Sequence, residues 1–170
     1  MIRLARMNEL PLIMEMVSAG IQQLAEQHSP QWQNGYGPSE EQFIQDIHAK
    51  NCFVYTQDEQ ILAVAVVVRG QELAYQTLTD DKWLAISKAY DTIHRFVVRS
   101  GTKGIGKQFL TELVQQQVAQ EHLDIRIDTH ELNLGMQKVI LYAGFTYIGK
   151  VRYPIPNGER LVYQYLAKKN

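Results

Sequence analysis

A short run of glycines and lysines is the part of this chain whose residue types and spacing could do chemistry. It reads Gly101-Thr102-Lys103-Gly104-Ile105-Gly106-Lys107. An apolar triplet precedes it (Phe96, Val97, Val98), and apolar residues at helical spacing follow it (Ile105, Phe109, Leu110, Leu113). Glycine lets a backbone approach a ligand closely, and the first N–H groups of a helix have no partner within that helix. These N–H groups and the helix dipole attract anions, most often phosphate. The stretch therefore predicts a strand, a pyrophosphate-binding loop and a helix.

Two known nucleotide-binding motifs do not fully match the glycine run. The spacing from Gly101 to Lys107 fits the start of the triphosphate-binding motif G-x-x-x-x-G-K, but the residue that should be Ser or Thr is Gln108. That motif usually follows the first strand of its domain, whereas several predicted strands precede this loop. The dinucleotide motif G-x-G-x-x-G is absent in this order. A strand-to-helix turn that binds no ligand is the simplest alternative.

Hydrophobic periodicity and capping residues predict the elements that position this loop. Before it we expect a strand at 2–4, a helix from the N-cap Asn8 to Gln27, a loop at 31–38, a helix opened by Ser39 and Gln42, and a hairpin of strands at 52–56 and 61–68. Residues 70–92 are expected to hold a short strand and a short helix. After the loop we expect a helix to about Glu121, strands at 123–130, 145–151 and 160–166, and a helix at 134–143 that ends at Gly144. The order β-α-α-β-β-β-α-β-α-β-β predicts one α/β (α+β) domain over residues 1–170.

The composition excludes several classes of protein. Hydrophobic residues make up 45%, charged residues 21%, and the formal net charge is −1, so no overall field favours a nucleic acid or an acidic membrane. The single cysteine, Cys52, excludes an internal disulfide and a multi-cysteine zinc site, and it is expected as a buried thiol. The acidic pair Asp80-Asp81 is expected in a turn or a helix cap rather than at a metal. The chain has no signal-peptide core and no membrane-spanning run, so a soluble cytoplasmic protein without a metal is expected.

The whole chain resembles the GNAT superfamily of acetyl-CoA-dependent N-acetyltransferases. Its phosphate loop has the pattern R/Q-x-x-G-x-G/A after an apolar triplet. Here Phe96-Val97-Val98 stands in the place of the triplet, and Gly104-Ile105-Gly106 stands in the place of G-x-G. Gly101 occupies the position of the expected Arg or Gln, and Lys103 could supply some of the missing positive charge. Asn133 lies eleven residues before Gly144-Phe145, which matches the N…G-F spacing of the family, and the predicted element order also matches.

The resemblance implies a fold and a cosubstrate. The fold would be a mixed, mostly antiparallel sheet of about six or seven strands with about four flanking helices, splayed at its fourth and fifth strands. Acetyl-CoA would lie in the splay, without a metal or a covalent enzyme intermediate. Backbone groups of Phe96, Val97 and Val98 would bind the pantetheine and polarise the thioester, and Asn133 would bind the pantetheine arm. N–H groups over Thr102, Lys103, Gly104, Ile105, Gly106 and Lys107 would hold the pyrophosphate.

The resemblance specifies the catalytic residues less completely. Asp128, five residues before Asn133, lies where some relatives carry an acidic base, although it could equally be a solvated or ion-paired carboxylate. His94 is a second candidate base because imidazole titrates near neutrality, and His130 is a weaker one. Many relatives carry a tyrosine that acts as the general acid where this chain has Ile140. We expect Ile140 in the core. Tyr142 lies two residues later, about 200° around the helix, so it should point elsewhere.

The sequence identifies neither the acceptor amine nor the group that protonates the leaving thiolate. Without a tyrosine acid, either another group protonates the thiolate or the thiolate leaves unassisted, since a thiol pKa is about 8.5. The acceptor would be a small, N-terminal or lysine amine, and Trp32, Tyr36, Tyr75 and Trp83 are candidates for an apolar acceptor pocket. The resemblance also implies a possible homodimer. The alternative from another functional class is a protein of this fold that binds CoA without catalysis.

Overall fold

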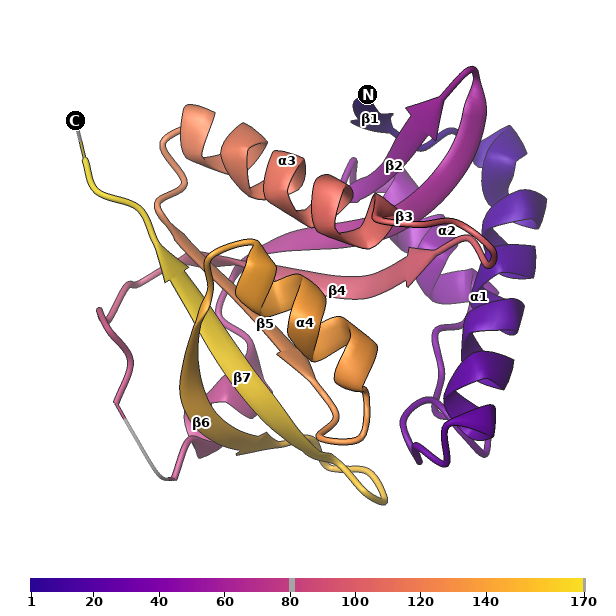
Figure 1. Cartoon of the computed structure of the whole chain (residues 1–170). Helices are drawn as coiled ribbons and strands as arrows, with labels where there is room; N and C mark the ends of the chain where they lie inside the picture. Colours follow the sequence, from indigo (N-terminus) through magenta and orange to yellow (C-terminus); the bar gives the residue numbers. More distant parts are fainter. Residues whose placement is uncertain (80–81, 170) are drawn as a thin grey trace.

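The computed structural model describes residues 1–79 and 82–169, which form a sheet covered by helices on both faces (Figure 1). The acidic pair Asp80-Asp81 lies outside the described residues. Cys52 is buried, as expected. None of the helices in the described ranges has the length and apolar character needed to cross a membrane.

Seven strands make up the sheet in the described part of the chain, in the order β1-β2-β3-β4-β5-β7-β6. Their bounds are β1 Ile2–Leu4, β2 Cys52–Gln57, β3 Gln60–Gly70, β4 Tyr90–Val98, β5 Asp124–Thr129, β6 Thr146–Arg152 and β7 Glu159–Leu166. Only the β4–β5 pair is parallel, and the other five pairs are antiparallel. The expected mixed, mostly antiparallel sheet is confirmed.

Two helices cover each face of the sheet. Helices α1 (Leu10–Glu26) and α2 (Glu40–His48) pack over β2 and β3, in a core around Ile13, Phe43 and Val64. Helices α3 (Ile105–Ala119) and α4 (Leu134–Tyr142) cover the opposite face, in a core around Phe109 and Ile125 (Figure 1). Two short 3₁₀ helices, η1 (Met7–Glu9) and η2 (Leu73–Thr77), complete the described elements. The sequence of helices and strands is the predicted one.

Local details depart from the prediction at two places. Asn8 does not cap α1, because it lies within η1, where the Glu9 carboxylate accepts a hydrogen bond from the backbone N–H of Arg6. Strand β4 begins at Tyr90, earlier than the apolar triplet indicated, since the buried residues Tyr90 and Ile93 extend its pairing with β3. Residues 70–92 therefore hold η2 and the start of β4. The capping box of Ser39 and Gln42 is confirmed.

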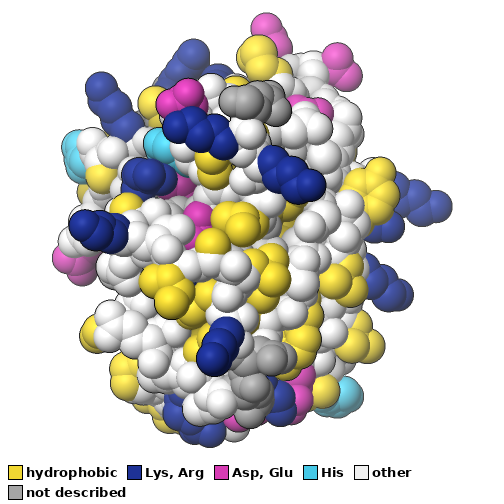
Figure 2. Space-filling model, turned by 90° about the vertical axis from the view of Figure 1, so that its left-hand side faces the viewer, with side chains coloured by type: hydrophobic (Ala, Val, Ile, Leu, Met, Phe, Trp, Pro, Cys, Tyr) yellow, Lys and Arg dark blue, Asp and Glu magenta, His cyan; other side chains and the backbone are white. Residues whose placement is uncertain are grey.

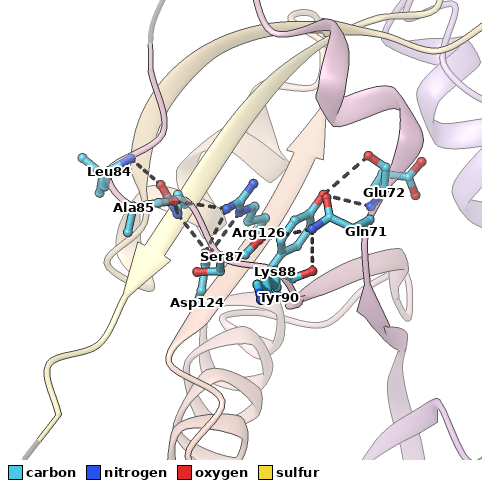
Figure 3. Close-up of polar contacts among 10 residues, drawn as sticks. Gln71, Glu72, Leu84, Ala85, Ser87, Lys88, Tyr90, Asp124 and Arg126 are labelled. Atoms are coloured by element: carbon cyan, nitrogen blue, oxygen red, sulfur yellow. Dashed lines mark hydrogen bonds and ion pairs between the residues drawn. The ribbon is translucent and has the colours of Figure 1, made fainter.

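The polar face of β5 is covered rather than solvated. Asp124 and Arg126 form a buried ion pair with an Nη2–Oδ2 distance of 2.9 Å. The Arg126 guanidinium lies 3.9 Å from the ring centre of Trp83 and 3.7 Å from that of Tyr90. It also donates a hydrogen bond to the carbonyl of Ala85, whose segment crosses this face (Figure 3). Burial of charge is tolerated when it is paired and hydrogen-bonded, so this network fixes the segment beside the end of β5.

Figure 2 shows the face that lies at the left of Figure 1. Hydrophobic side chains gather across its middle, among separate basic and acidic ones. Large hydrophobic residues between β3 and β4 are strongly exposed: Leu73 at 75%, Leu84 at 52% and Ile86 at 94%. The described side chains in this view form no continuous patch of a single charge.

Candidate active site

Strands β4 and β5 separate after a short stretch of pairing. Three residue pairs join them, the last being Ile93 with Ile127. His94 and Asp128, the two predicted catalytic residues, are the next residue on each strand. Beyond this point β4 continues to pair with β3 as far as Val98, so its other edge faces the gap. The expected splay at the fourth and fifth strands is present.

A β-bulge in β4 accompanies this separation. The pairing of β3 with β4 shifts between Val64 opposite Val97 and Val66 opposite His94. Arg95 lies in the extra segment with a φ of +51°, a left-handed conformation that side chains other than glycine rarely adopt. A bulge bends its strand and redirects side chains. Arg95 pairs with Asp46 of α2 through two hydrogen bonds of 2.9 Å, which hold the bulge against α2.

A cleft of about 580 Å³ runs through the gap between the two strands. Its walls come from α1, the loop before α2, β4, β5, α4 and the β6–β7 loop. The predicted site residues that line it are His94, Phe96, Val97, Val98, Thr102, Gly106, Asp128 and Asn133. The structure therefore brings most of the predicted cofactor residues and both candidate bases to one cleft.

The glycine loop lies at one end of this cleft. Gly104 is the N-cap of α3, with a φ of +72°, and no side chain in the described ranges caps this end of the helix. A Cβ on Gly106 would lie 3.2 Å from Val139 and 3.4 Å from Val98, so only glycine allows this close packing of α3, α4 and β4. The remaining loop residues do not line the cleft: Lys103 is exposed, Ile105 is in the core, and Lys107 lies 5.0 Å from the ring centre of Tyr142.

Helix α4 begins after its N-cap Asn133 and has Ile140 at the position of the family tyrosine. Oδ1 of Asn133 accepts a hydrogen bond of 3.2 Å from the backbone N–H of Met136, which caps the helix. Ile140 is fully buried, as predicted, and Tyr142 is 64% exposed. Thr129, at the end of β5, lines the cleft, and its hydroxyl has no hydrogen-bond partner among the described residues.

Two tyrosines hold Asp128 at the other side of the gap. The hydroxyls of Tyr75 and Tyr153 each donate a hydrogen bond of 2.7 Å to Oδ2 of Asp128. Burial and then the nearby Asp128 charge raise the pKa of both phenols well above its ordinary value. Both tyrosines therefore stay protonated at neutral pH. They fix the carboxylate in one orientation and leave Oδ1 to accept from a ligand.

His94 is positioned by an acidic residue of the segment that leads into η2. Its Nε2 lies 3.1 Å from Oε2 of Glu72. The hydrogen bond from His94 lowers the pKa of the Glu72 carboxyl, against the effect of its burial. A base oriented by a carboxylate is a recurring arrangement in proton transfer. His130 lacks this arrangement, because its Nδ1 accepts from the N–H of Leu132 and burial lowers its pKa.

Sequence reasoning missed Glu72, Tyr153 and Arg160 as site residues. Tyr153 and Arg160 flank the Pro/Gly loop that joins β6 and β7, and no periodicity reveals that this loop folds back toward β5. The expected acceptor pocket is partly wrong. Trp32 and Tyr36 line the cleft, but Tyr75 lies buried behind Asp128 and Trp83 packs on Arg126.

Solved structures of known proteins share the fold described above. No family model and no curated protein matches the chain. Among solved structures, an acetyltransferase of the GNAT family from Streptococcus agalactiae 2603 is 32% identical, with a TM-score of 0.91 over 99% of this chain and 96% of that one. A putative acetyltransferase from Staphylococcus aureus Mu50 is 21% identical, with a TM-score of 0.74 over 99% of each chain. A putative acetyltransferase from Salmonella typhimurium, solved with its cofactor acetyl-CoA, is 12% identical, with a TM-score of 0.69 over 100% and 95% of the two chains.

Proposed function

Because the chain belongs to the GNAT family of acetyltransferases, we propose that it moves the acetyl group of acetyl-CoA to a primary amine by direct attack. The observation that carries this proposal is the cleft through the β4–β5 splay. It connects the N-terminus of α3 on one face of the sheet with Asp128 and His94 on the other. A phosphate-binding end and a proton-accepting end in one cleft suit a reaction between an anionic cosubstrate and an amine.

The cofactor side of the cleft supports acetyl-CoA as the cosubstrate. The edge of β4 from His94 to Val98 has backbone groups that are not paired with β5. The pantetheine, which contains amides, would bind along this edge, and the pyrophosphate would bind the N–H groups of the first turn of α3. Because the Asn133 oxygen caps α4, its amide N–H groups are the ones available to the pantetheine arm. The Salmonella relative, solved with acetyl-CoA, has the same fold.

Asp128 would bind the amine, and His94 would remove its proton. Asp128 is suited to bind the ammonium form, because two phenols orient it through Oδ2 and Oδ1 remains to accept from a ligand. His94, oriented by Glu72, would take the proton. The neutral nitrogen then forms a bond to the acetyl carbonyl carbon while the bond between carbon and sulfur breaks. The electron pair leaves with sulfur. The nitrogen, which is cationic once it is bonded to carbon, loses a second proton; this proton passes through solvent to the thiolate, and His94 releases the first proton to solvent.

The leaving thiolate has no phenol acid at the family position, which Ile140 fills. A thiol with a pKa of about 8.5 is a tolerable leaving group, so the reaction can proceed without that acid.

The test is release of CoA from acetyl-CoA in the presence of a panel of primary amines, followed with a thiol reagent. We expect turnover with at least one amine and much slower turnover in His94→Gln. Saturable acetyl-CoA binding without turnover on any amine would instead favour a binding protein of this fold. Protection from thermal unfolding by ATP, with no effect of CoA, would favour the triphosphate-binding alternative.

A further inference from the structure

Arg160 is a buried cation that has no acidic partner among the described residues. Its side chain lines the cleft, and the residue is 6% exposed. Nη1 donates to the backbone carbonyls of Asn157 at 2.7 Å and Glu159 at 2.9 Å. Across the described ranges, no carboxylate lies within ion-pair distance of this guanidinium. Buried arginines are usually paired with an anion, so the remaining N–H donors of Arg160 are available to one that enters the cleft.

Two acidic residues near Arg160, Glu159 and Asp128, contact other groups. Glu159 points toward Lys150 and Arg152, at 3.5 Å and 3.8 Å. Asp128 accepts from Tyr75 and Tyr153. Burial lowers the pKa of Arg160, and the negative charge of Asp128 opposes this effect, so the guanidinium stays charged at neutral pH. Burial and the positive charge of Arg160 lower the pKa of His130, which is therefore a neutral neighbour.

The strand register places Arg160 beside the acceptor end of the cleft. Asp128 on β5 pairs with Val162 on β7, and Arg160 lies two residues before Val162. Since side chains two residues apart share a face, Arg160 is a diagonal neighbour of Asp128 on the same face, a separation of about 7 Å in antiparallel pairs. Val162 packs with Tyr75 and Tyr90, away from α3 and the phosphate loop. A negative site and a positive site therefore stand side by side where the amine must bind.

We propose that the acceptor is an amino acid, whose ammonium lies at Asp128 and whose carboxylate binds Arg160. This inference rests on the proposed acetyl transfer and narrows its acceptor. A zwitterion satisfies both charges, and a guanidinium binds a carboxylate through two parallel hydrogen bonds. A polyamine or a lysine side chain of a protein brings no carboxylate close to its amine. A protein N-terminus also lacks a carboxylate next to its amine, because the carboxyl group of the first residue forms a peptide bond. Its first free carboxylate is on a side chain.

The test compares each amino acid with the amine that lacks only its carboxylate, such as phenylalanine with phenethylamine and leucine with isoamylamine. We expect kcat/KM in the wild-type protein to be roughly 10- to 100-fold higher for the amino acid, as for a hydrogen-bonded charge pair. In Arg160→Gln this preference should disappear, through a higher KM for the amino acid, while the KM for acetyl-CoA and the turnover of the plain amine persist. Arg152→Gln is the matched control, because Arg152 is an exposed arginine on the neighbouring strand; it should keep the preference.

Three outcomes would overturn the inference. If the wild-type protein acetylates plain amines as well as or better than the amino acids, the proposed function stands and the amino acid acceptor is wrong. If Arg160→Gln lowers kcat/KM equally for both members of each pair, Arg160 only supports the β6–β7 loop. If acetyl-CoA binds but no amine of either kind is acetylated, the proposed function fails and the inference fails with it. Should Arg160→Gln not fold, the wild-type comparison decides alone.

Discussion

The phenol of Tyr153 donates a hydrogen bond of 2.7 Å to Oδ2 of Asp128 across a separation of 25 residues in the chain. Together with Tyr75, it makes a carboxylate at the end of β5 a fixed acceptor in the cleft. The β6–β7 loop thus takes part in the site, although it contains no recognisable motif.

Loss of the Tyr153 hydroxyl should weaken the site without abolishing it. In Tyr153→Phe, Asp128 keeps its bond from Tyr75 but loses one orienting donor. A hydrogen bond to a charged group contributes about 1.5–3 kcal/mol, so we expect kcat/KM for the amine to fall roughly tenfold. The KM for acetyl-CoA should change little. Tyr147→Phe is the control, since Tyr147 is 45% exposed and packs edge-on against Tyr163; equal losses in both variants would contradict the role of Tyr153.

Glu72 should make the protein less stable as the pH falls into the acidic range. The hydrogen bond from His94 lowers the pKa of the folded-state carboxyl below its ordinary value of 4.5. Its contribution to stability is therefore fully present above the unfolded pKa and is lost as the pH falls through the folded pKa. The wild-type Tm should drop more steeply below about pH 4.5 than that of Glu72→Gln. Glu15→Gln, at an exposed position of α1, provides the background; identical pH profiles for the wild type and Glu72→Gln would refute the coupling.

The close packing at Gly106 should make the cleft sensitive to one methyl group. In Gly106→Ala, the new Cβ meets Val139 at 3.2 Å and Val98 at 3.4 Å. We expect α3 to shift away from β4, with a loss of about 1–3 kcal/mol in stability and a clear rise in the KM for acetyl-CoA. The second change Val139→Ala removes the nearer contact and should restore part of both properties. No rescue in the double variant would mean that the strain lies elsewhere.

Thr129→Val should separate stability from binding. The hydroxyl of Thr129 is buried without a partner among the described residues, and an unsatisfied buried polar group costs about 1–3 kcal/mol. Replacing it with a methyl group of similar shape should raise the free energy of unfolding of the free protein. The affinity for CoA, measured by calorimetry, should stay the same, because the hydroxyl is buried away from the cleft surface. A several-fold loss of CoA affinity would contradict this and show that the hydroxyl reaches the ligand.

The sequence specified the fold more completely than the site because the relevant signals differ in range. The Ser39–Gln42 box, the alternation in β5 and Gly144 after α4 act over a few residues, so each could be read locally. The first turn before α1 was misread, since Asn8 lies inside η1 and the N-cap of α1 is Glu9.

The catalytic half of the site depends on contacts between distant segments. Asp128 and His94 were singled out from the sequence, but their partners Tyr75, Tyr153 and Glu72 come from a 3₁₀ helix, a loop and the segment that precedes that helix. The bulge at Arg95 carries no glycine or asparagine that would have marked its left-handed conformation. Arg160 reads as an ordinary strand residue until the register places it beside Asp128.

A crystal structure of the protein with bound CoA tests the central claim most directly. We expect the pyrophosphate within hydrogen-bond distance of backbone N–H groups in the first turn of α3. We also expect the pantetheine along the edge of β4 at Phe96 to Val98, with the sulfur near His94 and Asp128, where the strands have separated. CoA bound outside the β4–β5 cleft, or no binding at saturating CoA, would contradict the account.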